Sequence, residues 1–281
     1  MTDLYEKENP FISTVVEPNV GASDKDSKSM DAEATVKTAS DVASSEDDKE
    51  NAQRWKYIFH KRLALERELG KETVKMKEVM NMIKEAGILK TVCNIGKCYE
   101  KLVREFLVNV SGDCDNPLSQ EYHKVYVRGE CVNFSPNIIN RYLGIEEAGA
   151  AELKVTDDQI CREITANKVR VWPKKGKISS GKLLVKYAIL NRIDASNWVP
   201  TTHSSNIATR LGKFIYSVGT RTRMNLGKYV FEQTVKHAKT DAVKFPIAFP
   251  TLLCNIMIEQ RPSLVTIVDT PMKRESPLTL H

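Results

Sequence analysis

A dense run of basic residues around one tryptophan has the composition of a nucleic-acid-binding segment. Between positions 162 and 186, eight Lys and Arg residues accompany a single acid, Glu163. Such a run can neutralise several phosphates, and Trp172 inside it can stack on an unpaired base. The alternative is a solvated loop that Trp172 anchors to the core. With a second cluster further along the chain, the candidate nucleic-acid-binding residues are Arg162, Lys168, Arg170, Trp172, Lys174, Lys175, Lys177, Lys182, Arg210, Lys213, Arg221 and Arg223.

Two further groups of residues have the types that catalysis uses. Asp157, Asp158 and Glu163 are closely spaced carboxylates, and a transposase-type enzyme needs acidic residues that hold two metal ions. At a predicted helix N-terminus, however, Asp157 and Asp158 are typical dipole-complementing residues. His203 beside Ser204 does not make a triad, and the sequence has no GxSxG, P-loop, GxGxxG or HExxH motif. We therefore expect a non-enzymatic protein without catalytic residues or cofactors.

The cysteines are spaced neither as in zinc fingers nor as in nucleocapsid-type knuckles, so we predict thiols and no metal site. The N-terminus also lacks a basic region followed by an apolar run. These features indicate a reducing intracellular compartment, cytoplasmic or nuclear, and no signal peptide. The longest apolar stretch, residues 245–258, is short and contains two prolines, so no transmembrane segment is predicted in this chain. The six cysteines are Cys93, Cys98, Cys114, Cys131, Cys161 and Cys254.

Charge divides the chain into a tail and a body. Residues 1–50 contain 13 Asp and Glu against 5 Lys and Arg, a net charge of −8, with few large apolar residues. Residues 51–281 contain 37 Lys and Arg against 23 Asp and Glu, a net charge of +14. We predict a disordered acidic N-terminal tail over residues 1–50, a helical domain over residues 52–262 and an extended C-terminal segment over residues 263–281.

Helical spacing of apolar residues dominates the body. The clearest stripe runs from Tyr99 to Val110, with charged residues on its other face. Thr156 and Gln159 predict a capping box, and Pro250 predicts the first turn of the last helix. The predicted fold class is mainly α, a multi-helix globular domain with one small β-hairpin at about residues 125–134. Helices are expected near residues 55–63, 76–87, 99–110, 136–143, 156–164, 183–193 and 207–218, from residue 226 onward, and over residues 250–261.

The predicted hairpin leads directly into a capped helix. A strand ending at Val127 alternates apolar and polar residues, Gly129 supplies the positive φ of a tight turn, and residues 131–134 return as the partner strand. Ser135 then fits an N-cap, and Gly144 fits the left-handed position after the helix. The helix is about two turns long, so this unit must pack on something larger to persist.

Two motifs around this hairpin resemble a plant mobile-element family. Residues 127–134 fit the pattern VRG-x-x-V-x-F, and residues 139–144 fit the pattern I-N-x-x-L-G. Both resemble the putative plant transposon protein domain, as in the envelope-like proteins of plant long-terminal-repeat retrotransposons. Further similarity at residues 182–193, 197–200, 202–204, 226–237, 246–250 and 256–262 extends the resemblance to roughly residues 55–280.

The resemblance implies a retrotransposon-encoded, non-enzymatic structural or interaction protein whose helical domain binds itself or another protein of the element. It supplies no catalytic residues, and it implies that the chain continues beyond a segment like residues 274–281. A nucleic-acid-binding module that uses the basic clusters is the alternative, with the acidic tail competing for them. A transposase-type enzyme is the third alternative.

Overall fold

The computed structural model describes residues 46–145, 155–174, 177–198, 205–222, 225–243 and 246–279. Most of the predicted acidic tail lies outside these ranges, although the first helix already begins at Glu46, inside the predicted tail. Two of the candidate nucleic-acid-binding residues, Lys175 and Arg223, also lie outside them, as do His203 and Ser204.

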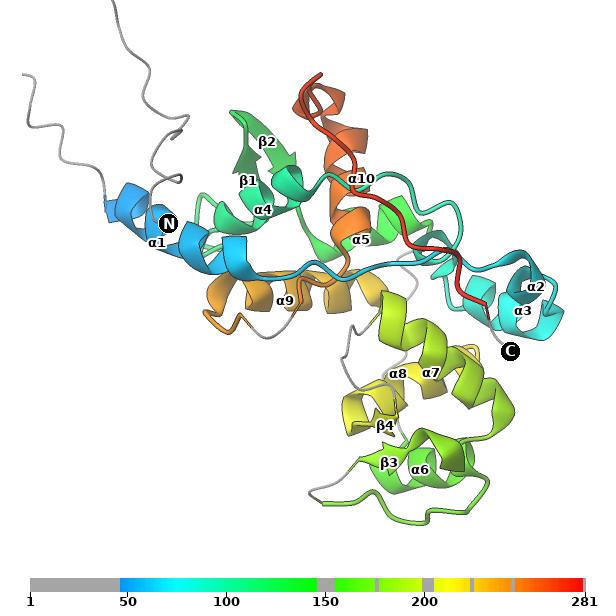
Figure 1. Ribbon diagram of the computed structural model, residues 1–281. Coiled ribbons are helices and arrows are strands. Elements are labelled where there is room, and N and C mark those ends of the chain that lie inside the picture. Colours follow the sequence, from blue (N-terminus) through cyan, green and yellow to red (C-terminus); the bar gives the residue numbers. More distant parts are fainter. Residues whose placement is uncertain are drawn as a thin grey trace, which may run out of the picture. The chain divides into compact units, whose positions relative to one another are not determined.

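The prediction of a mainly α fold is confirmed (Figure 1). The described helices are α1 (Glu46–His60), α2 (Lys71–Val74), α3 (Lys77–Glu85), α4 (Glu100–Val108), α5 (Pro136–Leu143), α6 (Asp157–Thr165), α7 (Val185–Asn197), α8 (Thr209–Gly219), α9 (Leu226–Lys239) and α10 (Pro250–Gln260). Short 3₁₀ turns are η1 (Leu89–Thr91), η2 (Ser180–Lys182) and η3 (Pro262–Leu264). The strands are β1 (Lys124–Val127), β2 (Glu130–Asn133), β3 (Ile178–Ser179) and β4 (Asn206–Ile207).

The predicted hairpin is confirmed as the antiparallel pair of β1 with β2, and the described residues contain a second antiparallel pair, β3 with β4, that the sequence analysis did not predict. Ile207 was expected on a helical stripe but lies in β4, opposite Ile178. Leu63 likewise lies beyond the end of α1 and forms a parallel bridge with Ile247. Both residues are buried. Because an extended segment can bury an apolar side chain as well as a helix can, apolar spacing alone did not fix these helix ends.

The hairpin and the helix after it follow the predicted local chemistry. The turn between β1 and β2 has positive φ at Arg128 (51°) and at Gly129 (79°). The Ser135 side chain accepts a hydrogen bond from the Ile138 N–H at 3.2 Å, and Gly144 ends α5 in the left-handed conformation. This unit packs on α9, as its shortness requires.

Contact between α5 and α9 is close because α9 has a glycine at the crossing. A Cβ on Gly227 would lie 2.1 Å from the Pro136 carbonyl oxygen, so only glycine fits without a shift. The Gly227 N–H donates to Asn140 Oδ1 at 2.8 Å, and Asn140 Nδ2 donates to Asn225 Oδ1 at 2.9 Å. Asn225 also caps α9 by accepting from the Lys228 N–H at 2.9 Å. Buried Asn140 thus ties the two helices together, with both its Oδ1 and its Nδ2 hydrogen-bonded inside the protein.

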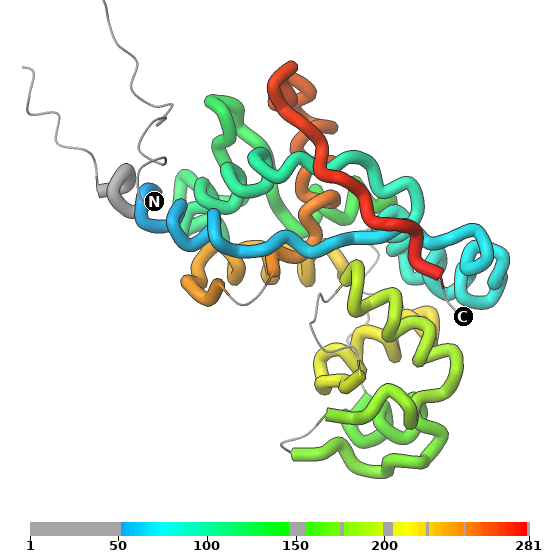
Figure 2. Tube along the Cα trace, in the orientation of Figure 1, coloured from blue at the N-terminus to red at the C-terminus, as the bar shows by residue number. Residues whose placement is uncertain are grey.

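The C-terminal segment runs beside the segment that follows α1 (Figure 2). The Leu278 N–H donates to the Glu68 carbonyl at 2.7 Å, and the Gly70 N–H donates to the Leu278 carbonyl at 2.9 Å. The Met272 N–H donates to the Cys98 carbonyl at 2.7 Å. Residues 265–279 form no helix, and these bonds hold them along the body.

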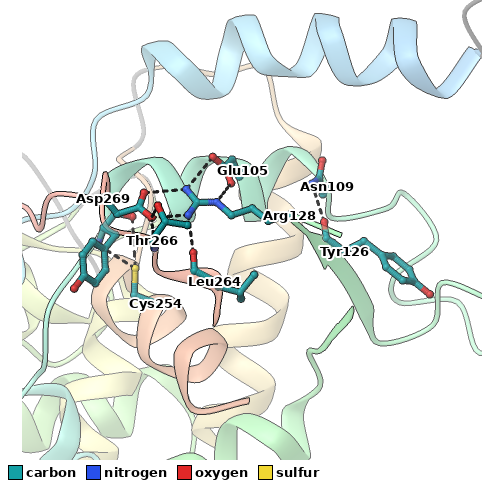
Figure 3. Close-up of polar contacts among 9 residues, drawn as sticks. Glu105, Asn109, Tyr126, Arg128, Cys254, Leu264, Thr266 and Asp269 are labelled. Atoms are coloured by element: carbon teal, nitrogen blue, oxygen red, sulfur yellow. Dashed lines mark hydrogen bonds and ion pairs between the residues drawn. The ribbon is translucent and has the colours of Figure 1, made fainter. Parts of the chain in front are cut away.

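An arginine in the hairpin turn fixes the start of that segment (Figure 3). Arg128 donates to both oxygens of Glu105 on α4 (2.8 and 3.2 Å) and to both oxygens of Asp269 (2.6 and 3.0 Å). It also donates to the Leu264 carbonyl at 2.6 Å. The Thr266 N–H and Oγ1 both donate to Asp269 Oδ2 at 2.8 Å. Hydrogen bonds from Arg128 and Thr266 hold the pKa of Asp269 well below its usual range.

Helices α6, α7 and α8 gather with the β3–β4 pair into one part of the fold (Figure 1). We call residues 155–222 the basic module. Helix α8 contacts both α6 and α7. The predicted capping box is confirmed at the start of α6, where Gln159 N donates to Thr156 Oγ1 at 3.3 Å and the Thr156 N–H donates to Gln159 Oε1 at 3.0 Å.

Candidate nucleic-acid interface

The basic loop after α6 folds back along that helix. Arg162 Nε, in the last turn of α6, donates to the Arg170 carbonyl at 3.0 Å. Two residues further along the loop, the Trp172 N–H donates to Asp158 Oδ1, in the first turn of α6, at 2.8 Å. The loop therefore runs antiparallel to α6, and side chains on α6 hold its backbone at two places.

Trp172 is buried, with 7% of its surface exposed. Its ring lies against α8 so closely that a Cβ on Gly212 would be 2.2 Å from Trp172 Cη2. Burying an indole of this size contributes about 4–6 kcal/mol, from which the buried Nε1–H without a hydrogen-bond partner subtracts about 1–3 kcal/mol. The proposed role of Trp172 in base stacking is not compatible with this position. The indole anchors the loop, which was the alternative interpretation.

This anchoring holds the loop of the first basic cluster against α8, the helix that carries residues of the second cluster. Lys174 follows Trp172 by two residues, and Lys213 follows Gly212 directly, so residues of both clusters flank one packed contact. An ion pair of 2.7 Å between Lys213 and Asp157 joins α8 to the first turn of α6. The Trp172 backbone is bound to the same turn of α6. The proximity of the clusters could not be derived from the sequence, because Trp172 and Gly212 are 40 positions apart.

The nine described basic candidates are all exposed. Lys213 pairs with Asp157, Arg221 pairs with Glu85 at 3.5 Å, and the Arg210 guanidinium lies 5.0 Å from the centre of the Tyr229 ring. Exposed ion pairs of this kind are weak, so a phosphate can replace the carboxylate. Within the described part of the chain, the candidates without an ion-pair partner include Lys168, Lys174, Lys177 and Lys182.

The acids of the basic module oppose a phosphate only weakly. Asp157 is paired with a lysine, and Asp158 accepts from the Trp172 backbone. Asp194 is fully buried in α7, and burial raises its pKa well above the ordinary value, which favours the neutral form. Glu163 is exposed and contacts the Tyr216 hydroxyl, whose pKa is raised by burial and by that carboxylate.

Positive charge is concentrated in this module. Residues 155–222 contain 12 Lys and Arg against 4 Asp and Glu, a net charge of +8. The remaining residues between 51 and 281 contain 25 Lys and Arg against 19 Asp and Glu, a net charge of +6 spread over a much longer stretch. The electrostatic field of this module is therefore the one in the body that attracts a polyanion most strongly.

The acidic residues considered for a transposase do not form a two-metal arrangement of carboxylates. Asp157 and Asp158 occupy the first turn of α6 and contact Lys213 and the Trp172 backbone, as described above. In the described ranges as a whole, no group of three or more His, Cys, Asp or Glu side chains is placed to hold a metal ion.

A second set of titratable groups lies between the segment after α1 and the start of α10. The Thr251 N–H donates to Glu66 Oε2 at 2.6 Å, and burial raises the pKa of Glu66 to about 7. Beside it, the Cys254 thiol and burial raise the pKa of Cys98 above its ordinary value. A catalytic thiol needs a lowered pKa, so these contacts act against a thiolate nucleophile. All six cysteines are free thiols.

No helix among the residues that the structure describes is long and apolar enough to cross a membrane. Comparison of the sequence with protein families gives a match to the putative plant retrotransposon-related domain over residues 84–262. The match includes the hairpin, the whole basic module, α9 and α10. Comparisons with the curated proteins and with the solved structures gave no match.

Proposed function

This chain belongs to the family of the putative plant retrotransposon-related domain, and we propose that it is a non-enzymatic binding protein of such an element that binds nucleic acid through the basic module. The observation that carries the proposal is the packing of Trp172 on Gly212, which joins two clusters of exposed cations on adjoining elements. The weak opposition from the local acids adds to it.

Binding of this kind has a quantitative signature. A protein that neutralises about six phosphates of duplex DNA has a slope of log K against log salt near −5. Its affinity then falls about a thousandfold or more between 50 and 200 mM salt. A binding site based on shape or apolar contact has a much smaller slope, so the slope itself tests the proposal.

The test is anisotropy of labelled nucleic acid with the full chain across a salt series. A charge-reversed triple variant, K168E/K174E/K177E, should lower the slope by about three and weaken binding steeply. The matched control K71E/K77E/K84E reverses three exposed lysines of α2 and α3, outside the module. It should retain most of the affinity. Absence of binding in 50 mM salt, or equal losses in both variants, would refute the proposal.

The acidic tail belongs to the same proposal as a competitor for the module. Residues 1–43 contain 9 Asp and Glu against 4 Lys and Arg, a net charge of −5. Removing them leaves α1 whole, whereas removing residues 1–50 cuts into it. We expect the shortened chain to bind nucleic acid more tightly at low salt, with the gain disappearing at high salt. An unchanged affinity would argue against competition.

A structural or interaction role, as in envelope-like proteins, is the second candidate function. It is favoured by the loop that Arg128 holds, where Ile267 is 104% exposed and Val268 is 79% exposed. Two apolar side chains on a fixed loop can enter a partner with little loss of conformational entropy. Sedimentation of the full chain across a concentration series, compared with I267S/V268S and with the control L118S, tests whether the partner is a second copy. Equal behaviour of all three proteins would exclude self-association through this loop.

A further inference from the structure

We infer that the nucleic acid bound by the basic module is double-stranded. This inference rests on the proposed function and names the form of its ligand. All five Phe, Trp and Tyr side chains between residues 155 and 222 are buried, at 7% exposure or less: Trp172, Tyr187, Trp198, Phe214 and Tyr216. Among the described residues of the module, none therefore offers an exposed aromatic ring to a base.

Tight, sequence-tolerant binding of a single strand draws much of its energy from exposed aromatic rings. Proteins that bind single strands combine a basic groove with aromatic side chains on which the bases stack. Without stacking, the cations of the module have only the phosphates to contact. A duplex carries one phosphate per 1.7 Å of its axis, whereas each strand alone carries one per 3.4 Å. The same set of cations therefore meets about twice the charge density on a duplex.

The placement of the cations along α6 suits two strands. Lys213 of α8 forms an ion pair with Asp157, the first residue of α6. Lys168 comes shortly after Thr165, the last residue of α6. At 1.5 Å per residue, Asp157 and Thr165 are about 12 Å apart along the axis of α6. This span is close to the width of the major groove of B-DNA, about 12 Å. Cations at the two ends of α6 can thus contact phosphates on opposite strands, whereas a single strand supplies one row.

The loop also has the rigidity that a duplex favours. Its backbone is held by Arg162 and Asp158, and its tryptophan is packed on α8. A fixed set of cations matches the regular phosphate spacing of a duplex without ordering a flexible strand.

The experiment measures binding of the full chain to a labelled 20-nucleotide DNA strand, to the same strand in a duplex, and to the corresponding single- and double-stranded RNA, at several salt concentrations. We expect the duplexes to bind about tenfold or more tightly than the single strands, with a steeper salt slope. The DNA and RNA arms distinguish the two duplex geometries, and a preference for either duplex supports the inference.

Two single variants sharpen the test. K168Q and K213Q neutralise one cation at each end of α6, and each should weaken duplex binding about fivefold at 0.1 M salt, while the control K84Q should not. Single strands bound as tightly as duplexes, or more tightly, would overturn the inference and leave the proposed function standing. No binding to any of the four probes would overturn both.

Discussion

Replacing Arg128 by Met should destabilise the protein more than removing any exposed ion pair. The arginine makes five hydrogen bonds, to Glu105, to Asp269 and to the Leu264 carbonyl. Its side chain is 23% exposed, while that of Asp269 is only 3% exposed and that of Glu105 is 28% exposed. Methionine keeps much of the volume but leaves the Asp269 carboxylate buried without a cation.

The size of the expected loss in stability depends on the hydrogen bonds that Asp269 keeps in R128M. Removing one partner of a buried pair costs about 3–5 kcal/mol, because a buried charge remains uncompensated. Asp269 keeps two hydrogen bonds from Thr266, at 2.8 Å each, and the arginine is partly solvated. We therefore expect the lower limit, about 3 kcal/mol. For a unit of this size that corresponds to a fall in Tm of about 6–12 °C.

Urea unfolding at 25 °C and thermal unfolding measure the effect. The matched control is R261M, which removes a pair with Glu130 that is about half exposed (44% and 46%) and is expected to cost less than about 1 kcal/mol. The double variant R128M/D269N should be more stable than R128M, since it no longer buries a lone charge. Asp269 has a lowered pKa in the folded protein, so its contribution is present above about pH 4 and is lost as the pH falls below that. If R128M lost no more stability than R261M, the buried charge would not be what this contact compensates.

Three further changes have defined outcomes. G212A places a Cβ 2.2 Å from the Trp172 ring, so it should lower the free energy of unfolding in urea by about 1–3 kcal/mol. It should also shift tryptophan fluorescence to the red and weaken nucleic-acid binding. The control G181A, at an exposed glycine, should do none of these. Glu66 has a raised pKa of about 7, so its contribution to stability is present below about pH 4 and is lost as the pH rises through 7. Raising the pH from 5.5 to 8.5 should therefore lower the Tm of the unsubstituted protein more than the Tm of E66Q. S135A removes the N-cap of α5 and should cost about 0.5–2 kcal/mol in the same urea assay, and a loss below that range would mean that solvent replaces the cap.

Features that depend on neighbouring residues could be predicted from the sequence. Ser135 caps α5, Thr156 and Gln159 form the capping box of α6, and Gly129 takes a positive φ in the hairpin turn. In each case the donor, the acceptor or the steric constraint lies within a few positions, so composition at fixed spacing is enough. The predicted helix after Asn225 belongs to the same class, since Asn225 caps it.

Features that depend on distant partners could not be predicted. Arg128 lies in a motif whose glycine has an evident role in the turn, but its own partner Asp269 is 141 positions away. Lys61 carries a charged group and stands between His60 and Arg62 in the sequence. It is nevertheless fully buried and donates to the His237 carbonyl at 2.7 Å and to the Thr240 carbonyl, at the end of α9. A polar residue of this kind becomes predictable only when the topology shows which helix end needs a donor.

Trp172 illustrates why the candidate site needed the structure as well as the sequence. In the sequence it stands among cations, where both a base-stacking role and an anchoring role are compatible with its neighbours. The decisive residue is Gly212, which lets α8 receive the ring. The anchor also holds the loop that carries Lys174 against α8, the helix that carries Lys213, so packing and charge are not independent here. The burial that removes Trp172 from base stacking is the same burial that fixes this loop on α8. A phosphate-binding role therefore gains support from the observation that weakens the stacking role.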